Sequence, residues 1–153
     1  MTMDRQLKTT DIDKKLSQVE GFLGAFAYDE IPRTPTDRFS FVVNDDPSTK
    51  PGSHWIAVIF KNKTFFFIDS YGRSYKDETF PKQFRETMKD LFGSSNVKCN
   101  TRMLQNLFSN SCGEYTVYFI REMAEKSFMT VLSVFSENLK NNDNIVIKYF
   151  KTL

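Results

Sequence analysis

Four side chains in this sequence are of the types that a cysteine hydrolase needs. In chain order they are His54, which is the only histidine, and then Asp69, Gln105 and Cys112. An imidazole can act as a general base, a carboxylate can orient it, an amide can stabilise an oxyanion, and a thiolate can attack a carbonyl carbon. Their types and their order therefore indicate hydrolysis by a cysteine nucleophile.

The histidine and the aspartate lie at the outer ends of two apolar runs. These runs, 54–60 and 64–70, are rich in β-branched and aromatic residues and predict an antiparallel hairpin. With a two-residue turn midway between them, His54 lies opposite Tyr71 and diagonal to Asp69, so that both side chains share one face. A shift by one residue would separate them. Taken alone the pair is weak evidence, because a strand end and a surface histidine would show the same pattern.

The cysteine is predicted to lie in the first turn of a helix. Ser111 is a natural helix cap, so that Cys112, Gly113 and Glu114 would begin the helix. The positive end of the helix dipole favours a thiolate there, and Gly113 leaves room for a substrate carbonyl. We expect the backbone N–H of Cys112 and the side chain of Gln105 to bind an oxyanion. Gln105 on its own would fit a surface amide equally well.

The composition is that of one globular domain, and we expect a single domain over residues 1–153. Hydrophobic residues make up 40% of the chain and charged residues 26%, and the 16 Phe indicate an aromatic-rich core. No run is long enough to cross a membrane, and the polar first residues lack the apolar stretch of a secretory signal. We therefore expect an intracellular monomer that is not secreted and does not bind membranes.

The cysteine count and the charge argue against several other classes of site. Only Cys99 and Cys112 are present, so a disulfide framework is not expected, and two thiols with one imidazole cannot complete a four-ligand zinc site without carboxylates. We interpret Cys99 as a small core residue of a strand. The net charge of +2 is spread along the chain, and the cluster at Lys82, Arg85 and Lys89 is better explained as a solvated face than as a nucleic-acid groove.

The remaining pattern predicts an α+β fold. We expect a small, mostly antiparallel sheet flanked by helices, with the nucleophile at the N-terminus of a central helix. Residues 22–27 are expected to form a loop. Helices are predicted from Thr10 to Gly21, from Pro81 to Gly93, from Ser111 to about Lys126, from Ser127 to Leu139 and from near Asp143, and strands at 39–44, 54–60, 64–70 and 97–101.

Four ordered motifs resemble a known family. Segments 52–55 (GSHW), 67–72 (FIDSYG) and 111–115 (SCGEY), together with Gln105, resemble the adenovirus protease (adenain) family and its wider clan, which includes the Ulp1-type SUMO proteases. The upstream segment 21–32 resembles the N-terminal part of adenain-like proteases from viruses, virophages and Maverick/Polinton-type elements. The resemblance runs from about residue 20 to about residue 120. Four motifs in order are more specific than any one of them.

This resemblance implies a papain-like or adenain-like fold and a role for each residue. His54 would be the general base, Asp69 its orienter, Gln105 the oxyanion-hole side chain and Cys112 the nucleophile. Trp55 matches an aromatic residue of the clan that packs near the site, where it would cover the imidazole and contact substrate. A plain core tryptophan in a strand remains the alternative.

The resemblance also implies a function. Proteases of this family cleave capsid and other virion precursor proteins near glycine during maturation, so the protein would act in an infected host cell, in the cytoplasm or nucleus, and be packaged in the virion. The sequence itself requires no cofactor. Because adenovirus enzymes are activated by a disulfide-linked peptide and by DNA, an activating peptide and weak DNA binding are expectations of the analogy, beside the protein substrate.

Two features depart from the adenovirus enzymes. Only residues 113–153 follow Cys112, so the C-terminal helical region is shorter. Cys99 falls roughly where a peptide-tethering cysteine would lie, but its spacing to Gln105 is tight, and we do not transfer that role.

Two alternatives to a viral endopeptidase stay open. The same four residues could serve an isopeptidase that removes a ubiquitin-like modifier. A non-catalytic binding module could also have kept the fold, although working residues at all four positions argue against it.

Overall fold

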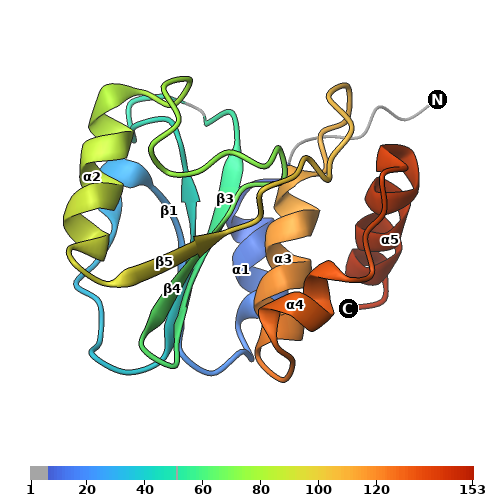
Figure 1. Cartoon of the computed structure of the whole chain (residues 1–153), viewed down its shortest axis with the longest axis horizontal. Helices are drawn as coiled ribbons and strands as arrows, with labels where there is room; N and C mark the ends of the chain where they lie inside the picture. The colour runs from blue at the N-terminus through green and yellow to red at the C-terminus, as the bar shows by residue number, and fades with distance from the viewer. Residues whose placement is uncertain (1–6, 51) are drawn as a thin grey trace.

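The computed structural model describes residues 7–50 and 52–153, which form a five-stranded sheet between two layers of helices (Figure 1). The strands lie side by side in chain order, as β1 (Phe22–Ala27), β2 (Phe39–Asn44), β3 (Trp55–Lys61), β4 (Thr64–Ile68) and β5 (Asn96–Cys99). The two central pairings, β2 with β3 and β3 with β4, are antiparallel, whereas β1 with β2 and β4 with β5 are parallel. The expected α+β class is confirmed, and the sheet is evenly mixed rather than mostly antiparallel.

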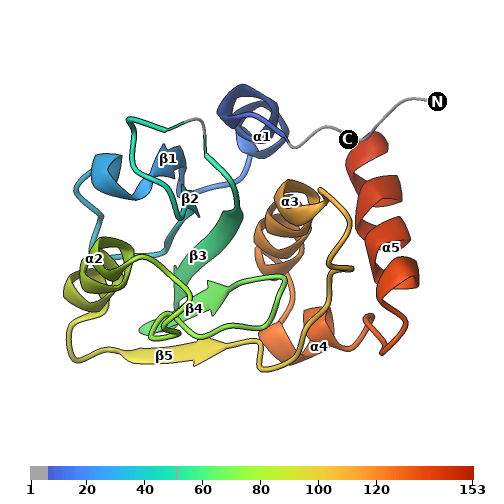
Figure 2. The ribbon, with the colours of Figure 1, turned by 90° about the horizontal axis from the view of Figure 1, so that it is seen from above.

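Helices cover both faces of the sheet (Figure 2). One face carries α2 (Lys82–Phe92) and the 3-10 turn η1 (Tyr28–Glu30). The other carries α1 (Thr9–Leu16), the central helix α3 (Cys112–Met123), α4 (Phe128–Leu132) and α5 (Leu139–Lys151). Within the described ranges, no helix has both the length and the apolar character needed to span a bilayer.

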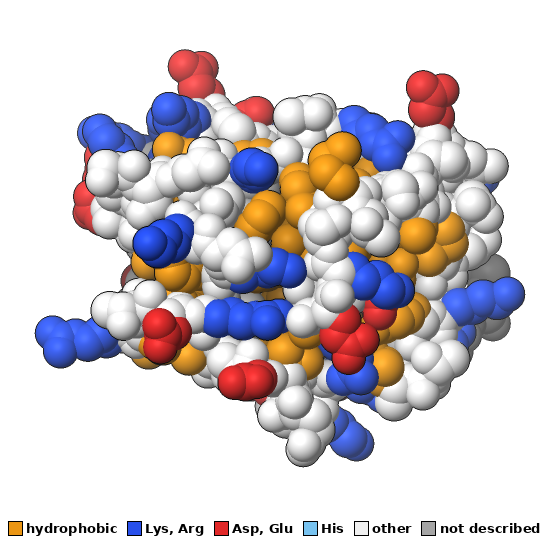
Figure 3. Space-filling model, turned by 60° about the horizontal axis from the view of Figure 1, so that its bottom comes forward, with side chains coloured by type: hydrophobic (Ala, Val, Ile, Leu, Met, Phe, Trp, Pro, Cys, Tyr) orange, Lys and Arg blue, Asp and Glu red, His pale blue; other side chains and the backbone are white. Residues whose placement is uncertain are grey.

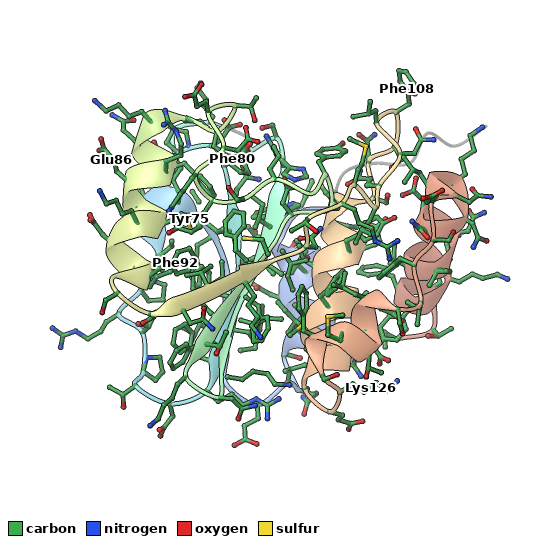
Figure 4. The ribbon with its side chains drawn as sticks, viewed as in Figure 1. Tyr75, Phe80, Glu86, Phe92, Phe108 and Lys126 are labelled. Carbon is green, nitrogen blue, oxygen red and sulfur yellow. The ribbon has the colours of Figure 1, made fainter. Side chains whose placement is uncertain are left out.

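Alternation along the strands divides the core in two. On β3, Ile56 and Val58 face α2, whereas Ala57 and Ile59 face α3. The α2 side is dominated by phenylalanine, and Phe80 and Phe92 lie between α2 and the sheet in Figure 4. Both rings meet the ring of Phe67 on β4 edge to face, a geometry that aromatic pairs prefer. The high Phe count is thus explained by this second core.

Three elements differ from expectation. Residues 22–27 form β1 rather than a loop, and a register shift between Phe22 and Ala25 gives its pairing with β2 an irregularity that hides the strand period. The helix predicted to start near Asp143 starts at Leu139, because the Asn138 side chain accepts a hydrogen bond from Asn141 N–H and caps it. The helix expected over 127–139 is limited to α4.

The β3–β4 hairpin has the predicted register. Ala57 pairs with Ile68 and Lys61 with Thr64, and the two turn residues between the strands, Asn62 and Lys63, have φ of 52° and 60°. Positive φ at both central positions is the type I′ turn, whose twist matches the strands. The turn therefore fixes the register that places Asp69, which follows β4, near His54, which precedes β3.

Replacing Lys63 with glycine is expected to stabilise the protein. A side chain with φ of 60° is strained, whereas glycine adopts this conformation freely, so the unfolding free energy should rise by about 0.5–1 kcal/mol. Lys63→Ala is the control, because it removes the charge but keeps the strained Cβ. Urea unfolding measures both, and a glycine variant no more stable than the alanine variant would contradict the role of the turn.

Candidate active site

The hairpin brings His54 and Asp69 together at one end of the sheet. His54 lies directly before β3 and Asp69 directly after β4, and the imidazole Nε2 is 2.5 Å from Asp69 Oδ1. Both side chains are buried. Because Nε2 is occupied by Asp69, the ring leaves Nδ1 for its hydrogen bond with the Cys112 thiol. Three of the four predicted residues are thus joined in the order carboxylate, imidazole, thiol.

The surroundings of His54 favour the protonated imidazole. Burial by itself lowers the pKa of His54, but the hydrogen bonds and charges of Asp69 and Cys112 outweigh it and raise the pKa from 6.5 to about 9. The protein therefore holds an imidazolium between two groups that carry or can carry negative charge, the arrangement of a reactive cysteine–histidine pair.

Arg73 binds the second oxygen of Asp69. Its Nε donates to Asp69 Oδ2 over 2.7 Å, and its backbone N–H donates to the same oxygen over 3.2 Å. The guanidinium lies 3.9 Å from the ring centroid of Phe80, which holds it in place. Burial raises the pKa of Asp69, but His54 and Arg73 together keep it below its usual range. Sequence reasoning missed Arg73, whose only signal was a cation four residues after the carboxylate.

Asn100 fixes the backbone that carries Asp69. It follows β5 and is fully buried, and its side chain accepts from Asp69 N–H at 3.1 Å and donates to Asp69 C=O at 2.6 Å. The side-chain amide thus continues the β4–β5 ladder where the strands end. No sequence pattern singled out Asn100, since it lies inside the segment 97–101 that was predicted to be a strand.

The ring stacked on His54 belongs to Tyr71, not to Trp55. The Tyr71 and His54 centroids are 4.8 Å apart with an interplanar angle of 16°. Trp55 points to the opposite face, in the core under α3, as adjacent strand residues do. Its indole N–H donates to Leu7 C=O over 2.7 Å, and both residues line a cavity of about 450 Å³ beside Gly52. The expected covering of the imidazole by Trp55 is therefore corrected.

Cys112 is the first residue of α3, as predicted, and its side chain faces His54. It is only 3% exposed, so very little of it is accessible from solvent. A Cβ on Gly113 would lie 3.0 Å from the Leu7 side chain, so the space beside the nucleophile is taken by Leu7 instead of being open for substrate. The Ser111 side chain makes no capping bond to the helix, contrary to expectation, and donates to Asp143 Oδ1.

Gln105 lies near the triad but its amide is engaged. The side chain is fully buried, with Oε1 accepting from Ser70 Oγ at 2.5 Å. Its Nε2 donates to the Ser109 carbonyl at 3.0 Å and to the Ser109 hydroxyl at 3.1 Å. The N–H₂ group thus points into the segment that leads to Cys112. Its role as an oxyanion donor stays a prediction.

Cys99 has none of these features. It is half-buried at the end of β5, against the Phe-rich core, and burial raises the pKa of its thiol. Among residues 7–50 and 52–153 there is no group of three or more His, Cys, Asp or Glu side chains placed to hold a metal ion.

The pKa of His54 can be measured directly, because it is the only histidine. We expect its imidazole NMR signal to titrate near pH 9, and to titrate lower in Asp69→Asn. A raised pKa contributes stability that is complete below pH 6.5 and is lost as the pH rises through about 9. Urea unfolding should show that loss. Titration at or below 6.5 would contradict the buried pair.

Asn100→Leu should destabilise the protein by about 2–4 kcal/mol, because the buried N–H and C=O of Asp69 both lose their hydrogen-bond partner. Asn96→Leu is the matched control, since Asn96 is exposed at the start of β5, the strand that Asn100 follows. Chemical denaturation compares the two variants. Equal stability would show that the Asn100 side chain does not hold Asp69.

Comparison with known proteins finds similar folds among solved structures. No protein-family model and no curated protein matches the sequence. The ASFV pS273R protease matches with a TM-score of 0.58 and 17% identity, over 90% of this chain and 64% of that one, so this chain spans less than two thirds of its length. ChlaDub1 from Chlamydia trachomatis matches with a TM-score of 0.60 and 11% identity, over 99% and 91% of the two chains.

A third match is a single domain of a larger protein. It is the central domain of the uncharacterized Lpg1148 protein from Legionella pneumophila, with a TM-score of 0.55, 13% identity and 97% coverage of both chains. At these identities the matches establish the fold. The chain has the α+β fold, with a five-stranded mixed sheet, of the papain-like and Ulp1-like cysteine proteases.

Proposed function

We propose that this protein is a thiol endopeptidase. The observation that carries the proposal is the buried chain of contacts from Asp69 through His54 to Cys112, with the thiol at the start of α3. Each of these side chains comes from a different element, so their meeting is a product of the fold and not of local sequence. The similarity in fold to the ASFV protease supports the same conclusion.

The reaction follows from the geometry. The Cys112 thiolate attacks the scissile carbonyl carbon, and the oxyanion that forms is bound by the Cys112 N–H and the Gln105 amide. For this, the amide exchanges one of its bonds to Ser109 for the substrate oxygen. The imidazolium of His54 then protonates the leaving amine, and water releases the acyl group, with His54 taking its proton.

The substrate class we propose is a capsid or other virion precursor protein, cut near glycine in the infected cell or the virion. Two observations support small residues at the cut. Cys112 is only 3% exposed, and Leu7 occupies the space over Gly113. A virion substrate is supported by the resemblance of the motifs to adenain-like proteases and by the fold of the ASFV protease.

Removal of a ubiquitin-like modifier is the second candidate. It is favoured by the similarity to ChlaDub1, whose name denotes a deubiquitinase and whose length this chain nearly matches. Both reactions use the same thiol chemistry, so the site itself does not separate them. The choice between endopeptidase and isopeptidase depends on which acyl group can reach Cys112.

An activating peptide and weak DNA binding stay predictions of the family analogy. Lys82, Arg85 and Lys89 line a cavity of about 520 Å³ on α2 together with Glu86. On the face in Figure 3, Lys and Arg side chains are scattered among acidic and apolar ones and do not gather into one patch. Such a surface favours weak, salt-sensitive DNA contact at most.

Cys112→Ala should lower peptide hydrolysis by about four orders of magnitude while leaving the fold intact, because the nucleophile is lost. Cys99→Ala is the matched control and should keep full activity. The substrates are a fluorogenic peptide with glycine on both sides of the bond, the same peptide with leucine there, and a ubiquitin–aminocoumarin conjugate. Release of fluorophore is the readout, and circular dichroism checks the fold.

Each substrate decides one point. Cleavage of the glycine peptide alone supports the endopeptidase, and cleavage of the ubiquitin conjugate alone supports the isopeptidase. Cleavage by Cys112→Ala, or none of the three substrates cut by the wild type, would overturn the proposal in favour of a non-catalytic module.

A further inference from the structure

The loop between Gln105 and Cys112 is not held by the core. Its apolar residues Leu107 and Phe108 are 63% and 97% exposed, and Phe108 points away from the body of the protein in Figure 4. The loop nevertheless sets the distance between the predicted oxyanion donor and the nucleophile, because it joins them directly. Some other contact must hold its two ends.

One carboxylate oxygen touches both ends of this loop. Asp143, on α5, is 5% exposed, and its Oδ1 accepts from the backbone N–H of Asn106 at 3.4 Å and from Ser111 Oγ at 3.2 Å. Asn106 directly follows Gln105, and Ser111 directly precedes Cys112. Over residues 7–50 and 52–153, Asp143 forms no ion pair, so its buried carboxylate depends on hydrogen bonds.

Tyr115 fixes the carboxylate from the side of α3. Its hydroxyl lies 2.8 Å from Asp143 Oδ1 and 3.0 Å from the carbonyl of Leu104, the residue before Gln105. Burial, and after it the hydrogen bond and charge of Asp143, raise the pKa of Tyr115, so its hydroxyl stays a donor. Asp143 is therefore bound to α3, to α5 and to the loop at once.

The charge also sets the direction of a chain of hydroxyls. An ionised carboxylate only accepts, so Ser111 donates its single hydrogen to Asp143. Ser109, whose Oγ is 2.8 Å from that of Ser111, must then donate to Ser111 and keep a lone pair for Gln105 Nε2 at 3.1 Å. On the far side, Ser70 donates to Gln105 Oε1. The order of donors keeps the N–H₂ of Gln105 on the side of the loop that leads to Cys112.

We propose that Asp143 is a positioning residue: by holding both ends of the 106–111 loop and orienting its serines, it places the Gln105 amide relative to Cys112. The catalytic consequence rests on the proposed function, since Gln105 and Cys112 are its oxyanion donor and nucleophile. Asparagine at this position would keep an oxygen for the three donors but lose the negative charge, and hydrogen bonds to a charged acceptor are roughly twice as strong as neutral ones, so it would hold the loop less tightly.

The placement is tested without turnover. The side-chain amide of Gln105 is followed by ¹⁵N NMR, assigned with Gln105→Glu, in the wild type, in Asp143→Asn and in the control Tyr149→Phe. The control removes another bond between α5 and α3, from Tyr149 to Glu122. We expect slow amide hydrogen exchange in the wild type and the control and fast exchange in Asp143→Asn. Equal exchange in all three would overturn the proposal.

The consequence for catalysis is tested by two rates. With the glycine peptide, Asp143→Asn should lower kcat about 10–100-fold with little change in KM, because the oxyanion donor is misplaced. Alkylation of Cys112 by iodoacetamide should not change, because the thiolate displaces iodide from a saturated carbon and builds no oxyanion. An unchanged kcat, or alkylation that falls with it, would overturn the positioning role.

These arms separate the two proposals. A wild type that cleaves nothing would defeat the proposed function, and the exchange measurement would still decide whether Asp143 places the amide. Activity in the wild type with unaltered exchange in Asp143→Asn would leave the function and defeat the positioning.

Discussion

The structure depends on satisfying one fully buried carboxylate. Leaving Asp69 charged and unpaired would be costly, yet its two oxygens meet the imidazole of His54 and the guanidinium of Arg73. Each partner requires a further element. His54 is delivered by β3, Arg73 is held on the ring of Phe80, and Asn100 of the β5 end fixes the backbone. The partners of Asp69 thus come from the β3–β4 hairpin, from the end of β5 and from the side of the sheet that carries α2.

His54 connects this carboxylate to the other face of the sheet, where Cys112 lies. His54 enters from the sheet, whereas Cys112 begins a helix packed on the face opposite to α2. The site therefore lies where the two cores meet, at the end of the sheet. Cys112 is held by the packing of α3 against the sheet and against α1. His54 is held by the polar contacts around Asp69. A change in either core would shift one against the other.

The parts of the site that follow from periodicity could be predicted. Strand alternation and a two-residue turn were sufficient for the His54–Asp69 pairing. The helix start at Cys112 was also predicted, although the Ser111 side chain bonds to Asp143 and does not cap the helix. In contrast, Arg73 and Asn100 reach the site through loops whose conformation no pattern fixes. Asp143 lies far along the chain, on a helix whose packing against α3 is a tertiary fact. Strand β1 was also missed, because its irregular pairing with β2 interrupts the alternation that would have indicated a strand.

The central claim is that His54 and Asp69 make the thiol of Cys112 more reactive as a nucleophile than an ordinary cysteine thiol. The chain holds its own control, since Cys99 is half-buried away from the triad. The most direct measurement is the rate of iodoacetamide modification at each cysteine between pH 5 and 10, resolved by peptide mass spectrometry. The account predicts that Cys112 reacts faster than Cys99 throughout the range in which His54 is protonated, while Cys99, whose pKa is raised by burial, reacts only in alkaline solution. Two cysteines with the same alkaline profile would contradict it.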